Sequence, residues 1–260
     1  MNILEEIAER ARERVSAEKL SVPLEKMIYI AESVGTCPSF EEALRAQGMS
    51  FICEVKKASP SKGIIAEEFP YLQIAADYER AGAAAVSVLT EPFYFKGENR
   101  FLREIAERVN IPLLRKDFTV DSYMIYEAKA LGASAVLLIC SILDSGELKR
   151  YIELTHELGL SALVEAHDEA EVQMAIEAGA RIIGVNNRDL KSFKVDTGNS
   201  MRLRRLVPED IIFVSESGIQ TARDVAALHQ SGVDAVLIGE TLMRAGDKKA
   251  ELDKLRGGIK

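Results

Sequence analysis

The segment LGASAVLLI, at residues 131–139, places a glycine directly before a run of strand-forming apolar residues. Glycine readily takes the left-handed conformation that ends a helix, and short uncharged apolar runs are typical of strands buried on both faces. The same order of small residues and glycine recurs at 81–83, 178–180 and 231–233, each time before another apolar run. The repeat therefore predicts helices that lead into buried parallel strands.

Eight apolar runs of strand length recur along the chain, separated by longer amphipathic segments. They are Phe51–Lys57, Ala84–Leu89, Pro112–Lys116, Ala135–Ile139, Ser161–Glu165, Ile182–Val185, Ile211–Ser215 and Ala235–Ile238. Eight strands that alternate with helices favour a closed α/β barrel, the (β/α)8 or TIM barrel. An open doubly wound sheet is the alternative. Its nucleotide-binding form has a glycine-rich turn after the first strand, and residues 57–63 do not carry that pattern.

Three helical patterns precede the first predicted strand, at Ile3–Ser16, Leu24–Val34 and Phe40–Ala46. We interpret residues 1–50 as a helical extension and residues 51–260 as the barrel, together forming a single domain over 1–260. Two placements of the extension fit the pattern. It covers part of the barrel mouth, or one of its helices plugs the barrel floor.

The composition is that of an ordinary globular protein, with 260 residues, 47% hydrophobic and 28% charged. A net charge of -8 argues against nucleic acid as a partner, because phosphate-backbone binding needs a basic face. The chain has neither a signal-peptide core nor an apolar run of membrane-spanning length, which predicts a cytoplasmic protein without a membrane partner. Its cysteines, Cys37, Cys53 and Cys140, are far apart and are expected to be reduced.

Charged and polar residues stand where the predicted strands end, which is where barrels of this kind form their active sites. On the first strand Glu54 and Lys56 are two residues apart and share a face. The other strand ends carry Arg115-Lys116-Asp117, Glu165, Asn186-Asn187-Arg188-Asp189 and Ser215-Glu216-Ser217-Gly218. A ring of salt bridges closing the barrel end is the alternative. Charged and polar residues occur at the ends of five predicted strands, with lysines facing glutamates. This arrangement favours a proton-transfer site over a ring of salt bridges.

Glycines after the last two strands indicate a phosphate site. They occur in Ser217-Gly218-Ile219 and in Ile238-Gly239-Glu240-Thr241, where barrels often hold a phosphate between loop amides and a short helix. Ser59, after the first strand, adds a hydroxyl and an amide donor at the same end of the barrel. Glu240 is an acid, so we assign its backbone rather than its side chain to binding.

The histidines add little to this interpretation. His156 and His229 fall on helices, and His167 is interpreted as a loop residue rather than a metal ligand. No spacing indicates zinc, flavin, nicotinamide or nucleotide. We therefore expect no metal and no cofactor, a small phosphorylated substrate as the partner, and a monomer, with a homodimer as the alternative.

These residues resemble the indole-3-glycerol-phosphate synthase family of tryptophan biosynthesis over nearly the whole chain. The most specific segments are Glu54-Val55-Lys56-Lys57-Ala58-Ser59-Pro60-Ser61, Arg115-Lys116-Asp117-Phe118, Leu163-Val164-Glu165, Asn186-Asn187-Arg188-Asp189-Leu190 and Ser215-Glu216-Ser217-Gly218-Ile219. The resemblance implies a cofactor-free carboxy-lyase that converts 1-(2-carboxyphenylamino)-1-deoxyribulose 5-phosphate to indole-3-glycerol phosphate, with loss of carbon dioxide and water.

The resemblance also implies roles for individual residues. Lys116 is the expected general acid at the ketone oxygen, Glu165 the acid-base partner in dehydration, and Lys56 a second lysine that holds the carboxylate and donates a proton when hydroxide leaves. The anilino and hydroxyl groups of the substrate are expected to be oriented by Glu54, Asn186 and Ser217. Arg188 is expected to anchor the substrate nearby. Phe95 and Phe118 are expected against the anthranilate ring, and the phosphate clamp is expected to consist of Ser59, Gly218, Gly239 and the amide of Glu240.

The loop at 191–200 departs from the family pattern, because Thr197 stands where an apolar residue is usual and Gly198 is expected to loosen the start of the next helix.

Two other functions are alternatives to this assignment. One is an isomerase of a related pathway, which typically uses paired aspartates or a cysteine-aspartate pair. The other is a catalytically silent barrel, which has no reason to retain costly buried charges.

Overall fold

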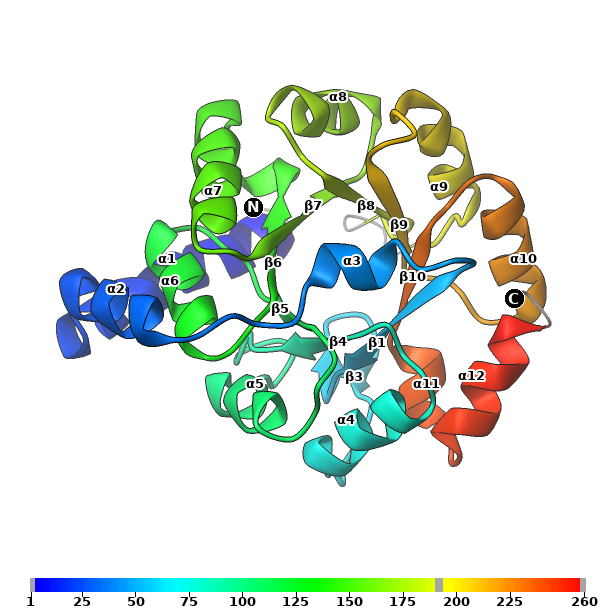
Figure 1. The fold of residues 1–260 in the computed structure, drawn as a ribbon, viewed down its shortest axis with the longest axis horizontal. Coiled ribbons are helices and arrows are strands. Elements are labelled where there is room, and N and C mark those ends of the chain that lie inside the picture. Colours follow the sequence, from blue (N-terminus) through cyan, green and yellow to red (C-terminus); the bar gives the residue numbers. More distant parts are fainter. Residues whose placement is uncertain (1–2, 190–193, 258–260) are drawn as a thin grey trace.

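Eight parallel strands close into a barrel in the computed structural model, which describes residues 3–189 and 194–257 (Figure 1). Around the barrel the hydrogen-bonded order is β1-β10-β9-β8-β7-β6-β5-β4. The strands are β1 (Ser50–Val55), β4 (Ala85–Leu89), β5 (Leu113–Lys116), β6 (Ala135–Ile139), β7 (Ser161–Ala166), β8 (Ile182–Asn186), β9 (Ile212–Glu216) and β10 (Ala235–Ile238). The predicted barrel is confirmed, and the open sheet is excluded because β1 pairs with both β4 and β10.

Several strand ends differ from the prediction by one or two residues. The first strand stops at Val55 instead of Lys57, because the chain then turns into a small antiparallel pair, β2 (Ala58–Ser59) and β3 (Gly63–Ile64). At the other side of the barrel β8 and β9 each run one residue further than predicted, since Asn186 pairs with Glu216. Ladder hydrogen bonds fix a strand end, and an apolar run marks it only approximately.

Helices surround the barrel between successive strands (Figure 1). They are α4 (Tyr71–Arg80), α5 (Asn99–Ala106), α6 (Ser122–Ala130), α7 (Ser145–Glu157), α8 (Glu169–Glu177), α9 (Gly198–Leu203), α10 (Ala222–Gln230), α11 (Glu240–Arg244) and α12 (Lys248–Arg256), with short 3-10 turns η1 (Cys140–Ile142) and η2 (Arg204–Leu206). The glycine of the opening segment, Gly132, has a φ of 85° at the end of α6, as its predicted helix-ending role requires.

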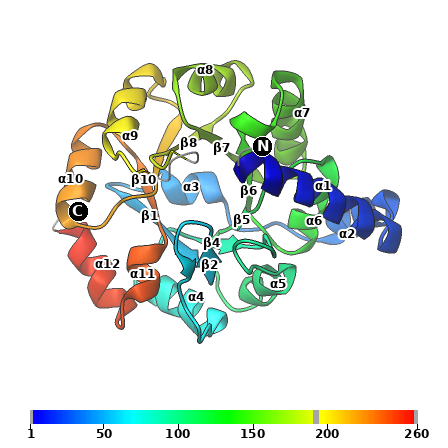
Figure 2. The ribbon, with the colours of Figure 1, turned by 180° about the vertical axis from the view of Figure 1, so that it is seen from behind.

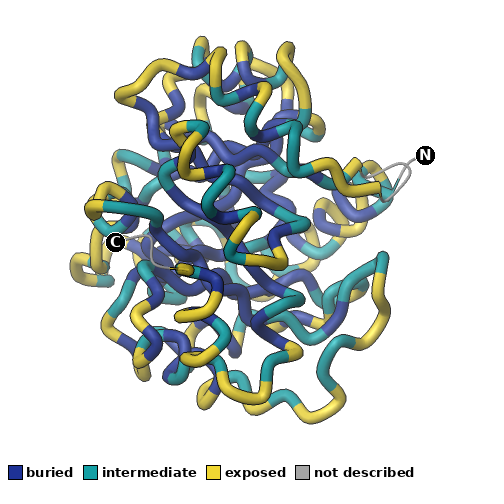
Figure 3. Tube along the Cα trace, turned by 90° about the vertical axis from the view of Figure 1, so that its right-hand side faces the viewer, coloured by how far each residue is buried: buried dark blue, intermediate teal, exposed yellow. Residues whose placement is uncertain are grey.

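Residues alternate along the strands between two apolar layers. On β9, Ile212 and Val214 face the barrel interior, whereas Phe213 packs with the surrounding helices. Figure 3 shows the buried residues at the centre of the molecule and the exposed ones on the outer turns. Because β9 ends at Glu216, the same alternation turns that carboxylate into the barrel. The mouth of the barrel therefore receives the side chains of the last inward position on each strand.

The extension reaches both ends of the barrel, so both predicted placements occur. It consists of α1 (Ile3–Ser21), α2 (Leu24–Ser33) and α3 (Phe40–Leu44). At the floor, Phe40 and Leu44 of α3 join the interior cluster, and the Leu44 carbonyl accepts a hydrogen bond from Ser50 Oγ at 3.3 Å. At the mouth α1 crosses in the foreground of Figure 2, whereas α3 lies in the foreground of Figure 1.

Helix α1 is longer than predicted, and ion pairs fasten it to the loop after β5. The helix continues past Ser16 to Ser21, because good helix formers follow, and the Ser16 hydroxyl donates to the Arg12 carbonyl at 2.9 Å. Arg14 donates to both carboxylate oxygens of the buried Asp117 at 2.9 Å. In the described ranges no helix is both long and apolar enough to cross a membrane.

Candidate active site

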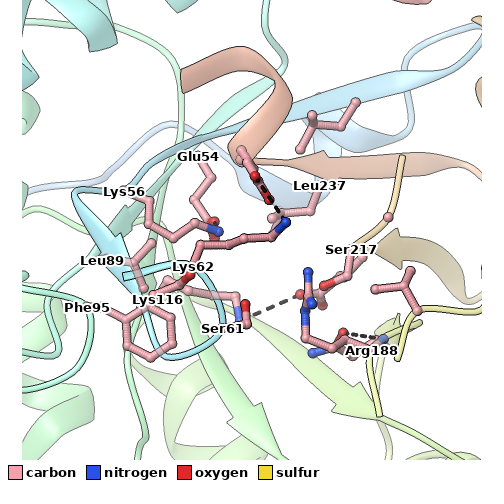
Figure 4. Close-up of a pocket in the computed structure, with 18 of the residues that line it drawn as sticks. Glu54, Lys56, Ser61, Lys62, Leu89, Phe95, Lys116, Arg188, Ser217 and Leu237 are labelled. Carbon is pink, nitrogen blue, oxygen red and sulfur yellow. Dashed lines mark hydrogen bonds and ion pairs between the residues drawn. The ribbon is translucent and has the colours of Figure 1, made fainter. Parts of the chain in front are cut away.

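A cavity of about 1060 Å³ opens at the carboxyl ends of the strands and brings together every residue to which the sequence analysis assigned a role, whereas Arg115 points away from it toward Glu127. Its lining includes Glu54, Lys56, Ser59, Phe95, Lys116, Phe118, Glu165, Asn186, Arg188, Ser217, Gly218, Gly239 and Glu240. Figure 4 shows Lys56 and Lys116 reaching in from one side and Arg188 and Ser217 from the other. Ile3, Leu4 and Ile7 of α1 cover part of the opening.

The first pair of charges comes from β1 and the residue just after it. Glu54 points inward near Ser87 of β4, and its Oε1 forms an ion pair with Lys56 Nζ. A side chain at Gly239 would collide with both groups, so the pair lies against the backbone that follows β10. The Lys56 ammonium is thus held between a buried carboxylate and the loop with the predicted phosphate amides.

Lys116, the last residue of β5, carries the central cation. Its Nζ lies 3.1 Å from Glu165 Oε2 and 3.6 Å from Glu216 Oε2. Burial alone lowers the pKa of Lys116, but the neighbouring acidic side chains, above all the Glu165 carboxylate, outweigh burial and raise it above its ordinary value. Lys116 is therefore protonated at neutral pH and is able to donate a proton.

Glu165 is held through both of its oxygens. Oε2 faces Lys116, and Oε1 accepts a hydrogen bond from Asn186 Nδ2 at 3.3 Å. Burial raises the pKa of Glu165, but Lys116 and His167 outweigh burial and lower it. Glu165 is therefore an ionised carboxylate, ready to accept a proton.

Glu216 is the site residue to which the sequence analysis gave no role. Its side chain is 2% exposed, and burial, with the nearby Glu165 and Glu54 carboxylates, raises its pKa to about 8 in spite of Lys116. Its Oε1 approaches Gly184 so closely that a Cβ atom there would collide with it, and the carboxylate would have to shift. The signal was present in the sequence, since Glu216 continues the inward alternation of Ile212 and Val214.

His167 contacts the site more closely than the sequence predicts. It lies in the loop directly after β7, as predicted, but its ring is held between two carboxylates, with Nε2 3.4 Å from Glu165 Oε1 and Nδ1 2.9 Å from Glu171 Oε2. The sequence holds a signal for the Glu171 contact, because Asp168 caps α8 and Glu171, three residues later, reaches back to the residue before the cap.

The far end of the cavity is rich in backbone donors. Ser217 and Gly218 both have positive φ, at 68° and 83°, and turn the chain after β9 toward the opening. Gly239 precedes α11, whose first residue is Glu240. The Glu240 side chain is engaged by Arg244 at 3.2 Å and Lys62 at 3.5 Å, which fits the prediction that its backbone, rather than its carboxylate, faces an anion.

An apolar half faces these charges. Phe95 and Phe118 have ring centroids 6.3 Å apart and a tilted arrangement, and Leu137, Ile139 and Leu237 continue the surface. Such a wall suits a flat aromatic group. Within residues 3–189 and 194–257, no group of three or more His, Cys, Asp or Glu side chains is arranged to hold a metal ion.

A buried amide fixes the loops around Asn186 and Ser217. Asn187 Nδ2 donates to Ser215 Oγ at 3.0 Å and to the Ser217 carbonyl at 3.1 Å, while its Oδ1 accepts from Ser200 N–H at 3.0 Å. Helix α9 begins at Gly198, whose N–H donates to Asp196 Oδ1 at 3.0 Å. The predicted departure of the loop at 191–200 falls in part on residues 191–193, which lie outside the described residues.

Comparison with known proteins assigns the chain to a family. A family profile described as indole-3-glycerol phosphate synthase matches residues 4–255. The chain belongs to the indole-3-glycerol phosphate synthase family. The match excludes the isomerases considered from the sequence, and the family-like segments at 54–61, 115–118, 163–165, 186–189 and 215–219 all contribute residues to the one cavity.

Curated members of the indole-3-glycerol phosphate synthase family are similar over their full length. The synthase of Ruminiclostridium cellulolyticum is 58% identical over 98% of this chain and 99% of its own. The synthase of Endomicrobium trichonymphae is 52% identical over 98% of this chain and 99% of its own. Among solved structures, 3-hexulose-6-phosphate synthase from Salmonella typhimurium shares the fold alone, with a TM-score of 0.66 and 16% identity over 80% of this chain and 97% of that one.

Proposed function

We propose that this chain is an indole-3-glycerol-phosphate synthase that converts 1-(2-carboxyphenylamino)-1-deoxyribulose 5-phosphate to indole-3-glycerol phosphate, carbon dioxide and water. The observation that carries the proposal is the position of the Lys116 ammonium, 3.1 Å from the Glu165 carboxylate inside a cavity with an apolar wall and an amide-rich end. This ring closure needs a buried acid, a buried base, and places for an aromatic ring and a phosphate.

The cavity suggests how the substrate lies. Its phosphate is proposed to bind the amides at Gly218, Gly239 and Glu240, with the Ser59 hydroxyl as a further donor. Its anthranilate ring is proposed to pack on Phe95 and Phe118, and Arg188 to anchor the substrate from the β8 side. The ketone carbon and the ring carbon that must join then lie between the two ends, near the lysines.

Ring closure is the first proposed step. The ring carbon that bears the carboxylate attacks the ketone carbon, and Lys116 transfers a proton to the ketone oxygen so that a hydroxyl forms instead of an alkoxide. The positive charge left in the aminated ring is cancelled when the carbon–carboxylate bond breaks, because its electron pair returns to the ring and carbon dioxide leaves. Glu54, Asn186 and Ser217 are proposed to orient the anilino and hydroxyl groups.

Dehydration is the second step. The new hydroxyl leaves as water after it takes a proton, which we assign to Lys56 because its ammonium lies beside Gly239 and Glu54, whereas Lys116 has served the ketone. Glu165 removes the proton whose loss completes the indole ring. Two protons are donated and one is removed, so each turnover takes up one proton from solvent.

The remaining proposals concern the state of the protein. We propose a monomer that folds as one domain, with a homodimer as the alternative, and light scattering distinguishes the two. The proposed substrate is a small soluble phosphate ester, which supports a cytoplasmic location.

The direct test is turnover. Purified protein treated with EDTA is mixed with the carboxyphenylamino substrate, and the rise of indole fluorescence is followed. We expect multiple turnovers without added metal or cofactor. A chain that is folded by circular dichroism yet produces no indole under any mild condition contradicts the proposal and favours a catalytically silent barrel.

A further inference from the structure

His167 lies between two carboxylates, on the opposite side of Glu165 from Lys116. Its Nδ1 is 2.9 Å from Glu171 Oε2, and the same oxygen accepts the backbone N–H of His167 at 2.8 Å. Its Nε2 is buried, has no conventional hydrogen bond to the described residues, and lies 3.4 Å from Glu165 Oε1. Glu171 thus fixes the ring through two contacts, and the ring presents its other nitrogen to Glu165.

The ring faces a second cavity instead of the substrate cavity. This second cavity, of about 570 Å³, is lined by His167 and Glu171 and meets the first one at Asn186 and Arg188. His167 is absent from the lining of the larger cavity. The contact between its ring and the proposed acid–base pair is the approach of Nε2 to Glu165 Oε1.

Opposite charges surround the ring. Glu165 of β7 and Glu171 of α8 are in direct contact, and the other charged groups that line the second cavity are Asp168, Arg188, Asp189, Lys194, Asp196 and Arg202. Burial lowers the pKa of His167, but the close carboxylates of Glu165 and Glu171 outweigh burial and raise it to about 10. At neutral pH the ring is a cation that offers a proton to each carboxylate.

We propose that His167, oriented by Glu171, is a positioning residue that holds Glu165 Oε1, so that Oε2 is directed at Lys116 and the substrate. The inference rests on the proposed role of Glu165 as proton acceptor. Without the ring, Oε1 keeps only the Asn186 amide at 3.3 Å, and the carboxylate is free to rotate away from Lys116. The imidazolium also favours the ionised form of Glu165, which restores the base after each turnover.

The kinetic test uses His167→Gln, Glu171→Gln and the double variant. His167→Gln should lower kcat by between about tenfold and about 100-fold, with KM within about twofold, because misplacing a catalytic group slows the chemical step without touching substrate binding. Glu171→Gln should lower kcat less, and should have no further effect in the His167→Gln protein, because Glu171 acts only through the ring.

His156→Gln on α7 is the matched control and should leave kcat unchanged, since His156 is remote from the cavity. A His167→Gln enzyme with wild-type kcat overturns the inference. The inference is also overturned if Glu171→Gln lowers kcat by the same factor in the His167→Gln protein as in the wild type.

A measurement independent of activity separates this inference from the proposed function. The chain has three histidines, so imidazole ¹⁵N spectra resolve each ring during a pH titration. His167 should stay doubly protonated well above the pH at which His156 loses its proton, and Glu171→Gln should lower the His167 pKa. A neutral His167 ring at pH 7 overturns the inference, whether or not the protein turns the substrate over.

Discussion

Lys116 Nζ lies 3.1 Å from Glu165 Oε2, and the two side chains come from strands that are not neighbours in the barrel, β5 and β7. The proposed acid and base are thus held by the curvature of the closed sheet. Each is nearly inaccessible to water, with side chains 16% and 3% exposed, so their mutual attraction is weakly screened.

Lys116→Met should lower kcat by about 10²- to 10⁴-fold, because methionine keeps the length and apolar stem but cannot donate a proton. Glu165→Gln should have a loss of similar order, since the amide keeps the shape but cannot accept the proton. Lys149→Met, at an exposed position on α7, is the control and should behave as wild type. Fluorescence-followed kinetics check all three, and full activity of Lys116→Met would refute its assignment.

Glu216→Gln should make stability less dependent on pH. The folded-state pKa of Glu216 is about 8 against an ordinary 4.5, so between these values the unfolded chain has released a proton that the folded chain keeps. This group's contribution to stability is therefore present at low pH and lost as pH rises from 4.5 through 8.

The permanently neutral glutamine removes that loss. Thermal melts at about pH 6 and about pH 9 should show a smaller fall in Tm for Glu216→Gln than for wild type, at roughly 2 to 4 °C per kcal/mol. Equal falls in both proteins would show that the Glu216 carboxyl is ionised at neutral pH.

Arg14→Ala should destabilise the protein by about 2 to 4 kcal/mol, because it removes the closest cation from the buried Asp117 and leaves Thr90, the Phe118 N–H and the more distant Arg115 as partners. KM should rise as well, since Ile3 and Leu4 on the same helix line the cavity. Arg12→Ala on α1 removes an exposed pair with Glu9 and should cost less than about 0.5 kcal/mol. Urea unfolding distinguishes the two, and equal effects would mean that Asp117 does not anchor α1.

Gly184→Ala should displace Glu216 and lower both stability and kcat. A methyl group at this inward position overlaps Glu216 Oε1, and overpacking of this kind costs about 1 to 3 kcal/mol. Gly35→Ala is the control, because a methyl group there meets nothing. Melting temperature and kcat are measured together, and a stable, fully active Gly184→Ala protein would show that Glu216 has room to move without consequence.

Local pattern was enough to predict the barrel, because eight apolar runs with glycine-ended helices leave few alternatives. It also placed Lys116 and Glu165 at the mouth of the barrel, because both stand at the carboxyl ends of their strands, where barrels of this kind form their active sites. The alternation of inward-facing residues on β9 also predicts that Glu216 points into the barrel. The predicted strand ended one residue before it, at Ser215.

Other features depend on tertiary packing and could not be read from the sequence. The division of the extension between mouth and floor is set by the Arg14–Asp117 pair and by the packing of Phe40 beneath the strands. In each case the partners are distant in sequence or come from separate elements.

The anchor of the first helix has a consequence for how the molecule is made. Arg14 and Asp117 are separated by 103 positions, so α1 is synthesised long before the residue that receives it. During synthesis, α1 therefore cannot be fastened at the barrel mouth until β5 and Asp117 have been added. Strands β6 to β10 must still follow before the barrel closes. The acid–base pair is completed later than this anchor, because Glu165 of β7 is added 49 positions after Lys116.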